Sequence, residues 1–164
     1  MLTTPLQLAT ITSVIATKGR RFRPRFLLGS ENRINDVLKI RKPVELARIS
    51  LESERNWDNV IKAMIGVNFD SNGTARRTWQ NTEYSAAGKT GTAQVVSLDN
   101  IESYDKEKLS KHLKDHSLFI GFAPIKEPKI AVAVVVEHGG TGSERAAPIA
   151  KKVIDTYILG RTDL

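Results

Sequence analysis

The chain contains no cysteine, so a disulfide framework and a thiolate metal site are both excluded. Long apolar runs are absent too. The longest, Ile130 to Val136, has seven residues, whereas a membrane-spanning helix needs about 20. The opening residues, Met1 to Pro5, lack the basic start and apolar stretch of a secretory signal. These absences favour a domain that is held together by an ordinary hydrophobic core.

The 164 residues are 40% hydrophobic and 26% charged, enough for one modest domain with a core. The net charge is +7, and five of the eight residues from Lys18 to Arg25 are basic. Such a run is either an anion-binding patch or a solvated connector after a helix. No nucleic-acid-binding motif accompanies it, which favours the connector. We therefore predict contact with neither nucleic acid nor a membrane.

Start and end signals predict a first helix. Thr4 and Gln7 form a capping box, Pro5 suits the first helical position, and Gly19 suits the end. Three apolar residues between them recur at helical spacing: Leu8, Ile11 and Ile15. This pattern predicts a helix that buries one apolar face.

The segment from Arg20 to Glu54 has little periodicity, and we predict it to be mostly irregular, with a possible short strand over residues 23–28. A second helix is predicted over residues 56–67, where apolar residues form one stripe: Trp57, Val60, Ile61, Met64 and Ile65. We expect Trp57 to be a core residue rather than part of a ligand site.

Two further strands are predicted, from Leu118 to Ala123 and from Ile130 to Glu137. The second begins with an apolar run without polar alternation, which is typical of a central strand covered on both faces by helices. A last helix is expected to begin near Ser143 or Arg145 and to end at Gly160.

The stretch from Ser85 to Val96 carries the most chemistry. Lys89 is followed at once by Thr90, Gly91 and Thr92. If this stretch is a strand, Thr90, Thr92 and Gln94 point to one side. Two hydroxyls about 7 Å apart beside an ammonium can bind a carboxylate or a developing oxyanion. The alternative is a glycine-containing edge strand with two ordinary threonines.

Histidine spacing offers one possible metal site. His112 and His116 are four residues apart, but no third ligand lies nearby in the sequence. We therefore predict no metal and no other cofactor. His138 follows a strand and precedes a glycine-rich turn, so we interpret it as a strand-end residue rather than a general base.

Several segments together resemble one enzyme family. They are TPLQLA at the first helix, Gly73-Thr74-Ala75, AAGKTGTAQ around Lys89, the polar segment from Ser97 to Asp115, Phe122-Ala123-Pro124, and His138-Gly139-Gly140 with its closing helix. This set resembles the C-terminal part of the transpeptidase domain of class B penicillin-binding proteins, in their penicillin-binding protein 2 subfamily. The resemblance implies an α+β fold, an antiparallel sheet flanked by helices. Residues 1–54 would form a helix plus an irregular region, and residues 55–164 the sheet and helices that carry the Lys-Thr-Gly motif.

The resemblance also implies roles for the Lys-Thr-Gly motif. Lys89 and Thr92 would be catalytic, and Thr90, Gly91 and Thr92 would bind the substrate's carboxylate. The Thr92 backbone N–H would form half of the oxyanion hole.

The family's other two motifs have only chance matches in this chain. Ser103 to Lys106 matches Ser-x-x-Lys but follows the third motif, and Ser30 to Asn32 matches Ser-x-Asn but follows the TPLQLA helix. We therefore expect a fragment without a nucleophile, which β-lactams do not acylate when it is alone.

The main hypothesis is part of a peptidoglycan D,D-transpeptidase that cross-links stem peptides at the periplasmic face of the bacterial inner membrane. Its partners would be stem peptides and β-lactams, and the chain would self-associate or pair with the missing N-terminal portion. Two alternatives stay open: a non-catalytic carboxylate-binding or assembly module, and a basic anion-binding protein.

Overall fold

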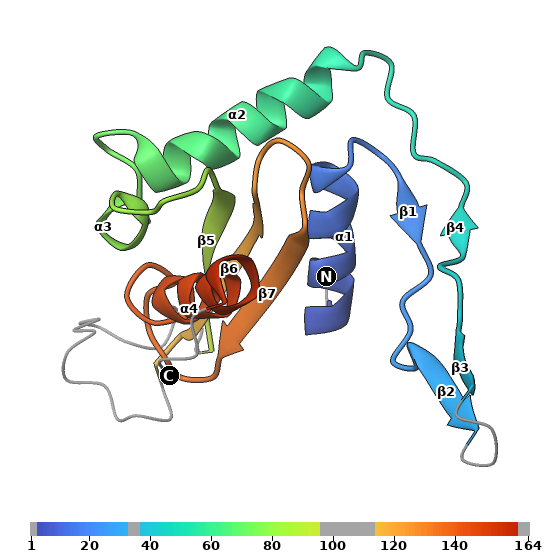
Figure 1. The fold of residues 1–164 in the computed structure, drawn as a ribbon. Coiled ribbons are helices and arrows are strands. Elements are labelled where there is room, and N and C mark those ends of the chain that lie inside the picture. The colour runs from blue at the N-terminus through green and yellow to red at the C-terminus, as the bar shows by residue number, and fades with distance from the viewer. Residues whose placement is uncertain (1–2, 33–36, 96–113, 161–164) are drawn as a thin grey trace.

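The computed structural model describes residues 3–32, 37–95 and 114–160. A three-stranded antiparallel sheet lies between helices (Figure 1). Its strands are β5 (Ala87–Ala93), β6 (His116–Ala123) and β7 (Ile130–Val136), in the order β5-β6-β7. The helices are α1 (Pro5–Ala16), α2 (Arg55–Phe69), the short α3 (Arg76–Trp79) and α4 (Ala146–Leu159).

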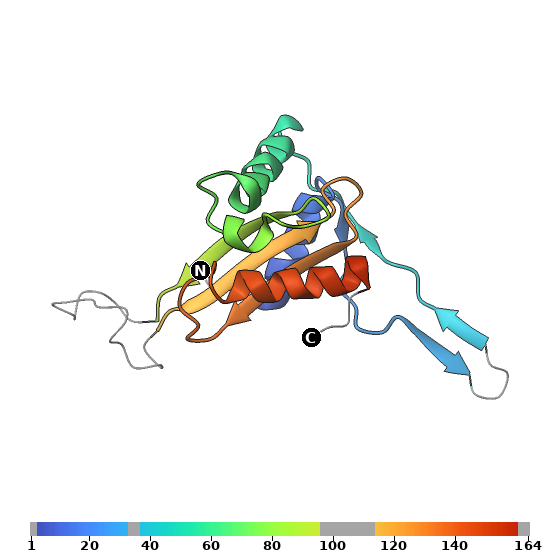
Figure 2. The ribbon, with the colours of Figure 1, turned by 60° about the vertical axis from the view of Figure 1, so that its left-hand side comes forward.

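Helices cover both faces of this sheet, with α1 on one side and α4 on the other (Figure 2). Alternation along β6 separates the two resulting cores. Phe119 is buried with α3 and α4 residues, among them Trp79, whose ring stacks on it at 5.8 Å between centroids. Phe122, on the opposite face, is buried with Ala16 of α1 and Met64 of α2. Each face of β6 therefore contributes one buried phenylalanine to a separate core.

The predicted limits of the helices agree with the structure. Thr4 accepts a hydrogen bond from the Gln7 backbone N–H at 3.2 Å, and the Gln7 side chain accepts one from the Thr4 N–H. Gly160 closes α4 in the left-handed conformation, with φ of 65°. Pro148 lies in the first turn of α4, where its missing N–H leaves no hydrogen bond broken. These local signals act within one turn, so the sequence alone can place them.

The helical faces expected to be buried are only partly so. Trp57 is buried, as predicted, but Val60 of the same stripe is 44% exposed. In α1 the buried residues are Thr12, Val14 and Ala16, whereas Ile11 is 54% exposed. The Thr12 hydroxyl tolerates burial because it donates to the Leu8 carbonyl at 2.7 Å. Apolar side chains of α1 and α2 thus remain open to solvent.

The prediction that Ile130–Val136 is a central strand is wrong for the described sheet. There β7 pairs with β6 alone, and β6 is the middle strand. The apolar run is explained by helices on both sides, because α1 and α4 each pack on β7. Cover on both faces and a central position are separate properties, and the sequence pattern reports only the first.

The segment from Arg20 to Glu54, expected to be mostly irregular, contains four short strands. β1 (Arg21–Phe22) pairs with β4 (Glu45–Leu46), and β2 (Gly29–Asn32) pairs with β3 (Val37–Ile40), both antiparallel. No strand forms over residues 23–28. The β2–β3 ribbon projects away from the helices and the main sheet (Figure 1). Strands this short lack the alternating pattern on which sequence prediction depends.

The basic run at the start of this segment is engaged in local contacts. Arg20 pairs with Glu45 at 2.9 Å, and Lys18 pairs with Asp58 of α2 at 2.7 Å. Arg21 donates to the Ala47 carbonyl at 3.0 Å. These contacts support the connector interpretation of the run.

Candidate active site

The Lys-Thr-Gly motif lies on β5, which in the described residues pairs with β6 only and leaves its other edge open. Thr90 lies opposite Phe119, and Thr92 lies opposite Ser117. Both threonines therefore share the sheet face that carries the Phe119 core and α4, as predicted from their spacing. Gln94 lies beyond the end of β5 at Ala93, so the predicted alignment of three polar side chains is reduced to two.

Lys89 lies on the other face of the sheet, opposite Ile120, on the side of α1. Its side chain is exposed, and its Nζ donates to the carbonyl of Thr90 at 2.6 Å. This hydrogen bond holds the ammonium against the backbone of β5. The strand β5 thus carries the Lys89 ammonium on one face of the sheet and the two threonine hydroxyls on the other.

A third threonine, to which the sequence analysis assigned no role of its own, contacts the motif. The Oγ1 atoms of Thr74 and Thr90 are 3.0 Å apart, so one hydroxyl donates to the other. Thr74 belongs to the Gly73-Thr74-Ala75 segment, and Ala75 is buried in the Phe119 core. The segment before α3 therefore orients a hydroxyl of the motif.

Glycines allow two close approaches to β5. A Cβ placed on Gly142 would lie 2.5 Å from the Gly91 carbonyl oxygen and 2.4 Å from that of Leu118. The turn that contains Gly142 is therefore in direct contact with the motif. A Cβ on Gly88 would lie 2.3 Å from the buried ring of Phe119. Both positions require glycine because of space, since neither has a positive φ.

Side chains on neighbouring helices fix the segment that leads into β5. The Asn68 side chain of α2 donates to the Ala86 carbonyl at 3.2 Å. The Tyr84 hydroxyl donates to Asp155 of α4 at 2.6 Å, and Lys151 pairs with the same carboxylate. These contacts attach the start of β5 to α2 and to α4.

The structure describes only one of the two histidines considered as metal ligands. His112 lies outside the described residues, and His116 begins β6. His116 Nδ1 accepts the backbone N–H of His138 at 3.0 Å, and the two rings meet edge to face. Among residues 3–32, 37–95 and 114–160, no group of three or more potential metal ligands comes together.

Only one of the two chance matches to the other motifs lies in the described residues. Ser30 lies on β2 in the projecting ribbon, away from the main sheet (Figure 1). Ser103 and Lys106 lie outside the described residues.

In the part of the chain that the structure describes, no helix is long and apolar enough to cross a membrane.

Comparison with known proteins assigns this arrangement to a family. The model of the penicillin-binding protein transpeptidase domain matches residues 1–155. The peptidoglycan D,D-transpeptidase MrdA of Haemophilus influenzae is 36% identical over 155 residues, which are 94% of this chain and 24% of that protein. MrdA of Acinetobacter baumannii is 37% identical over 159 residues, which are 96% of this chain and 23% of that protein. The chain thus spans about a quarter of these relatives.

Solved structures agree with this assignment. PBP2 of Pseudomonas aeruginosa matches 96% of this chain and 31% of its own chain, at 37% identity and a TM-score of 0.72. Penicillin-binding protein 2B of Streptococcus pneumoniae R6 matches 98% of this chain and 25% of its own, at 27% identity and a TM-score of 0.74. The predicted α+β fold, an antiparallel sheet flanked by helices, is confirmed. The chain therefore belongs to the penicillin-binding protein transpeptidase domain family, and within it to the penicillin-binding protein 2-like class B members.

Proposed function

We propose that this chain supplies the carboxylate- and oxyanion-binding strand of a peptidoglycan D,D-transpeptidase that works at the periplasmic face of the inner membrane. The main support is β5, whose outer edge pairs with no other described strand and which carries Lys89 on one face and Thr90 and Thr92 on the other. The two MrdA relatives are named peptidoglycan D,D-transpeptidases, and a related penicillin-binding protein A was solved as acyl-enzyme complexes with β-lactams.

In this proposal the residues of β5 divide the work of acyl transfer. The hydroxyls of Thr90 and Thr92 bind the terminal carboxylate of the donor peptide, or that of a β-lactam. The Thr92 backbone N–H donates to the oxyanion as a serine attacks the scissile carbonyl. Gly91 keeps the strand free of bulk where the peptide lies. The Lys89 ammonium stabilises the negative charge that develops beside it.

The nucleophilic serine and its lysine would come from a segment that packs on the Lys89 side of the sheet. That side carries exposed apolar side chains: Leu6 and Ile11 on α1, Val60 on α2, and Val135 on β7. Apolar surface of this kind usually marks an interface. We propose that the rest of a transpeptidase domain covers it, or a second copy of this chain when that domain is absent.

A chimera tests the function directly. The segment of this chain that aligns with the Haemophilus influenzae relative would replace the matching segment of that protein, and labelling by a fluorescent penicillin would be measured. We expect Lys89→Ala to slow acylation by about 10²–10³-fold, the cost of removing one preorganised stabilising group. Lys126→Ala, which changes an exposed lysine in the β6–β7 turn, is the matched control and should label normally.

Near-normal labelling of a folded Lys89→Ala chimera would remove Lys89 from the proposed site. The isolated 164-residue chain should show no penicillin adduct by mass spectrometry, because its sequence has only chance matches to the two motifs that supply and activate the family's nucleophile. A chimera that folds but is never acylated would favour the alternative, a non-catalytic carboxylate-binding module.

A further inference from the structure

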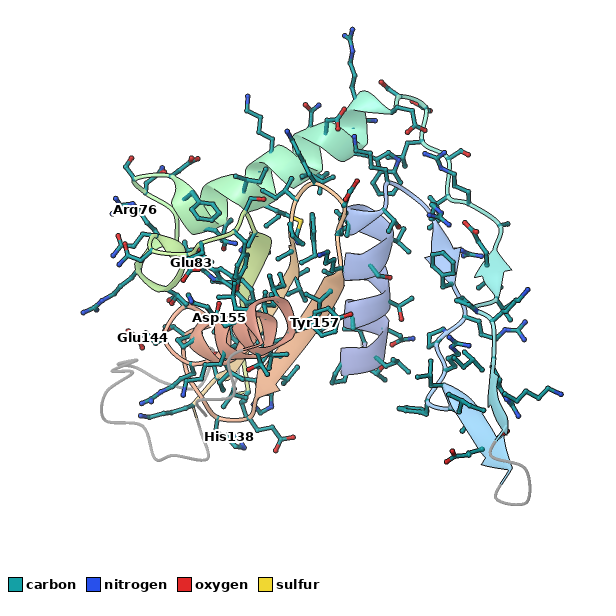
Figure 3. The ribbon with its side chains drawn as sticks, in the orientation of Figure 1. Arg76, Glu83, His138, Glu144, Asp155 and Tyr157 are labelled. Atoms are coloured by element: carbon teal, nitrogen blue, oxygen red, sulfur yellow. The ribbon has the colours of Figure 1, made fainter. Side chains whose placement is uncertain are left out.

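An open pocket of about 410 Å³ lies on the α3 and α4 side of the sheet. It is lined by Thr74, Arg77, Thr78, Ser143, Glu144 and Pro148. Arg77 and Thr78 come from α3, whereas Ser143 and Glu144 come from the turn that precedes α4. Figure 3 shows Glu144 beside the N-terminal end of α4. Two segments about 65 residues apart in the sequence thus form opposite parts of one pocket wall.

This pocket adjoins the threonine face of β5. Its residue Thr74 lies 3.0 Å from Thr90, measured between the two Oγ1 atoms. Its other wall begins at Ser143, directly after Gly142, whose backbone is in contact with Gly91. Because Thr90 and Thr92 point to this same face, a ligand in the pocket would lie next to whatever the motif binds.

The lining combines one cation, one anion and three hydroxyls. Arg77 and Glu144 are both exposed, and neither side chain belongs to an ion pair within residues 3–32, 37–95 and 114–160. A guanidinium binds a carboxylate through parallel N–H donors, and a carboxylate binds an ammonium. A simple anion would meet Glu144 and a simple cation would meet Arg77, so the lining favours a ligand that carries both charges.

We propose that this pocket binds the amino-acid end of the second, acceptor peptide, through an ammonium and a carboxylate on the same carbon. This inference rests on the proposed function, since a transpeptidase must place an amine-bearing peptide beside the acyl group that it transfers. The donor's carboxylate occupies Thr90 and Thr92 in that function, which leaves the adjoining pocket to the second peptide. Arg77 holds the acceptor's carboxylate, Glu144 holds its ammonium, and the hydroxyls of Thr78 and Ser143 complete the contacts. For transfer, the ammonium gives one proton to Glu144, and the free amine attacks the acyl carbonyl. Its second proton goes to the serine oxygen as the ester bond breaks.

Binding to the full 164-residue chain tests the pocket without any catalysis. Three probes of matched length would be titrated and followed by amide NMR: lysine, 6-aminohexanoate, which lacks the α-ammonium, and 1,5-diaminopentane, which lacks the carboxylate. We expect lysine to bind at least about tenfold more tightly than either of the others, the value of one charged hydrogen bond. Its shifts should appear at Thr74 to Thr78 and at Gly142 to Ala147.

Variants assign the binding to particular side chains. Arg77→Gln and Glu144→Gln should each weaken lysine binding by about tenfold. Arg76→Gln removes the same charge from the neighbouring position of α3, which does not line the pocket, and should leave binding unchanged. Equal affinities for the three probes, or unchanged binding in both pocket variants, would overturn the proposal.

The chimera separates failure of the pocket from failure of the proposed function. With a donor peptide and an amine acceptor, Arg77→Gln should leave β-lactam acylation unchanged and reduce transfer to the amine, relative to hydrolysis, by about tenfold. If the Arg77→Gln chimera is acylated normally and its ratio of transfer to hydrolysis does not change, the acceptor site alone is refuted. A chimera that is never acylated would instead refute the proposed function, and with it this assignment of the pocket, even if lysine binds.

Discussion

The contact between Gly142 and β5 predicts the effect of a single added methyl group. A Cβ on Gly142 would lie 2.4 Å from the Leu118 oxygen and 2.5 Å and 2.9 Å from the oxygen and nitrogen of Gly91. All three are backbone atoms, so no rotamer change can relieve the overlap, and the turn must move away from the motif. Overpacking of this kind typically costs about 1–3 kcal/mol. For a chain of this size, Gly142→Ala should lower the Tm by about 2–12 °C.

Thermal unfolding followed by far-UV circular dichroism measures this effect. Gly140→Asn, two residues away in the same turn, is the matched control. A Cβ there meets nothing within 4 Å, and asparagine tolerates its φ of 81° better than other residues do. We expect the control to change stability by less than about 1 kcal/mol. A Gly142→Ala protein with an unchanged Tm would show that the turn does not pack on Gly91 as described.

Three further predictions concern stability. Phe119→Ala should cost about 3–5 kcal/mol in urea unfolding, because a fully buried ring is lost from the core under α4; a smaller loss would mean that the core collapses around the gap. Thr4→Ala should cost about 1 kcal/mol in the same assay, since it removes the cap of α1, and no change would make that cap irrelevant. A hydrogen bond from Arg20 lowers the pKa of Glu45, so the stability contributed by this pair is present at neutral pH and is lost as the pH falls through that lowered pKa. An NMR titration should show the Glu45 pKa rising in Arg20→Gln, and an unchanged pKa would contradict the pairing.

Local signals account for most of what the sequence predicted correctly. The capping box at Thr4 and the left-handed Gly160 depend on neighbours within one turn, and both appear in the structure. The shared face of Thr90 and Thr92 follows from strand alternation alone. The motif itself was recognisable for the same reason, since its residues are consecutive.

Features that depend on distant neighbours could not be predicted. Ile11 and Val60 fit apolar stripes yet are exposed in the structure. Periodicity identifies the apolar face of a helix but does not show which element, if any, covers that face. The Thr74–Thr90 contact requires the path of the chain through α3 and back to β5. The pocket lined by Arg77 and Glu144 depends on the packing of α3 beside the turn before α4. Hydrophobic periodicity and short motifs carry no information on which distant segments of the chain come together.

The two faces of the sheet at β5 differ in how completely the described residues cover them. On the threonine face, Thr74 contacts Thr90, the Gly142 turn packs on Gly91, and the Phe119 core beneath is fully buried. On the Lys89 face, Ile11 of α1 and Val135 of β7 are exposed, so apolar surface on this side of the sheet lacks cover in the described residues. In the proposed function, carboxylate binding needs only the first face, whereas serine acylation needs a nucleophile on the second. Lysine, the probe of the pocket on the first face, should therefore bind to this chain alone, and penicillin acylation should appear only when another segment covers the Lys89 face.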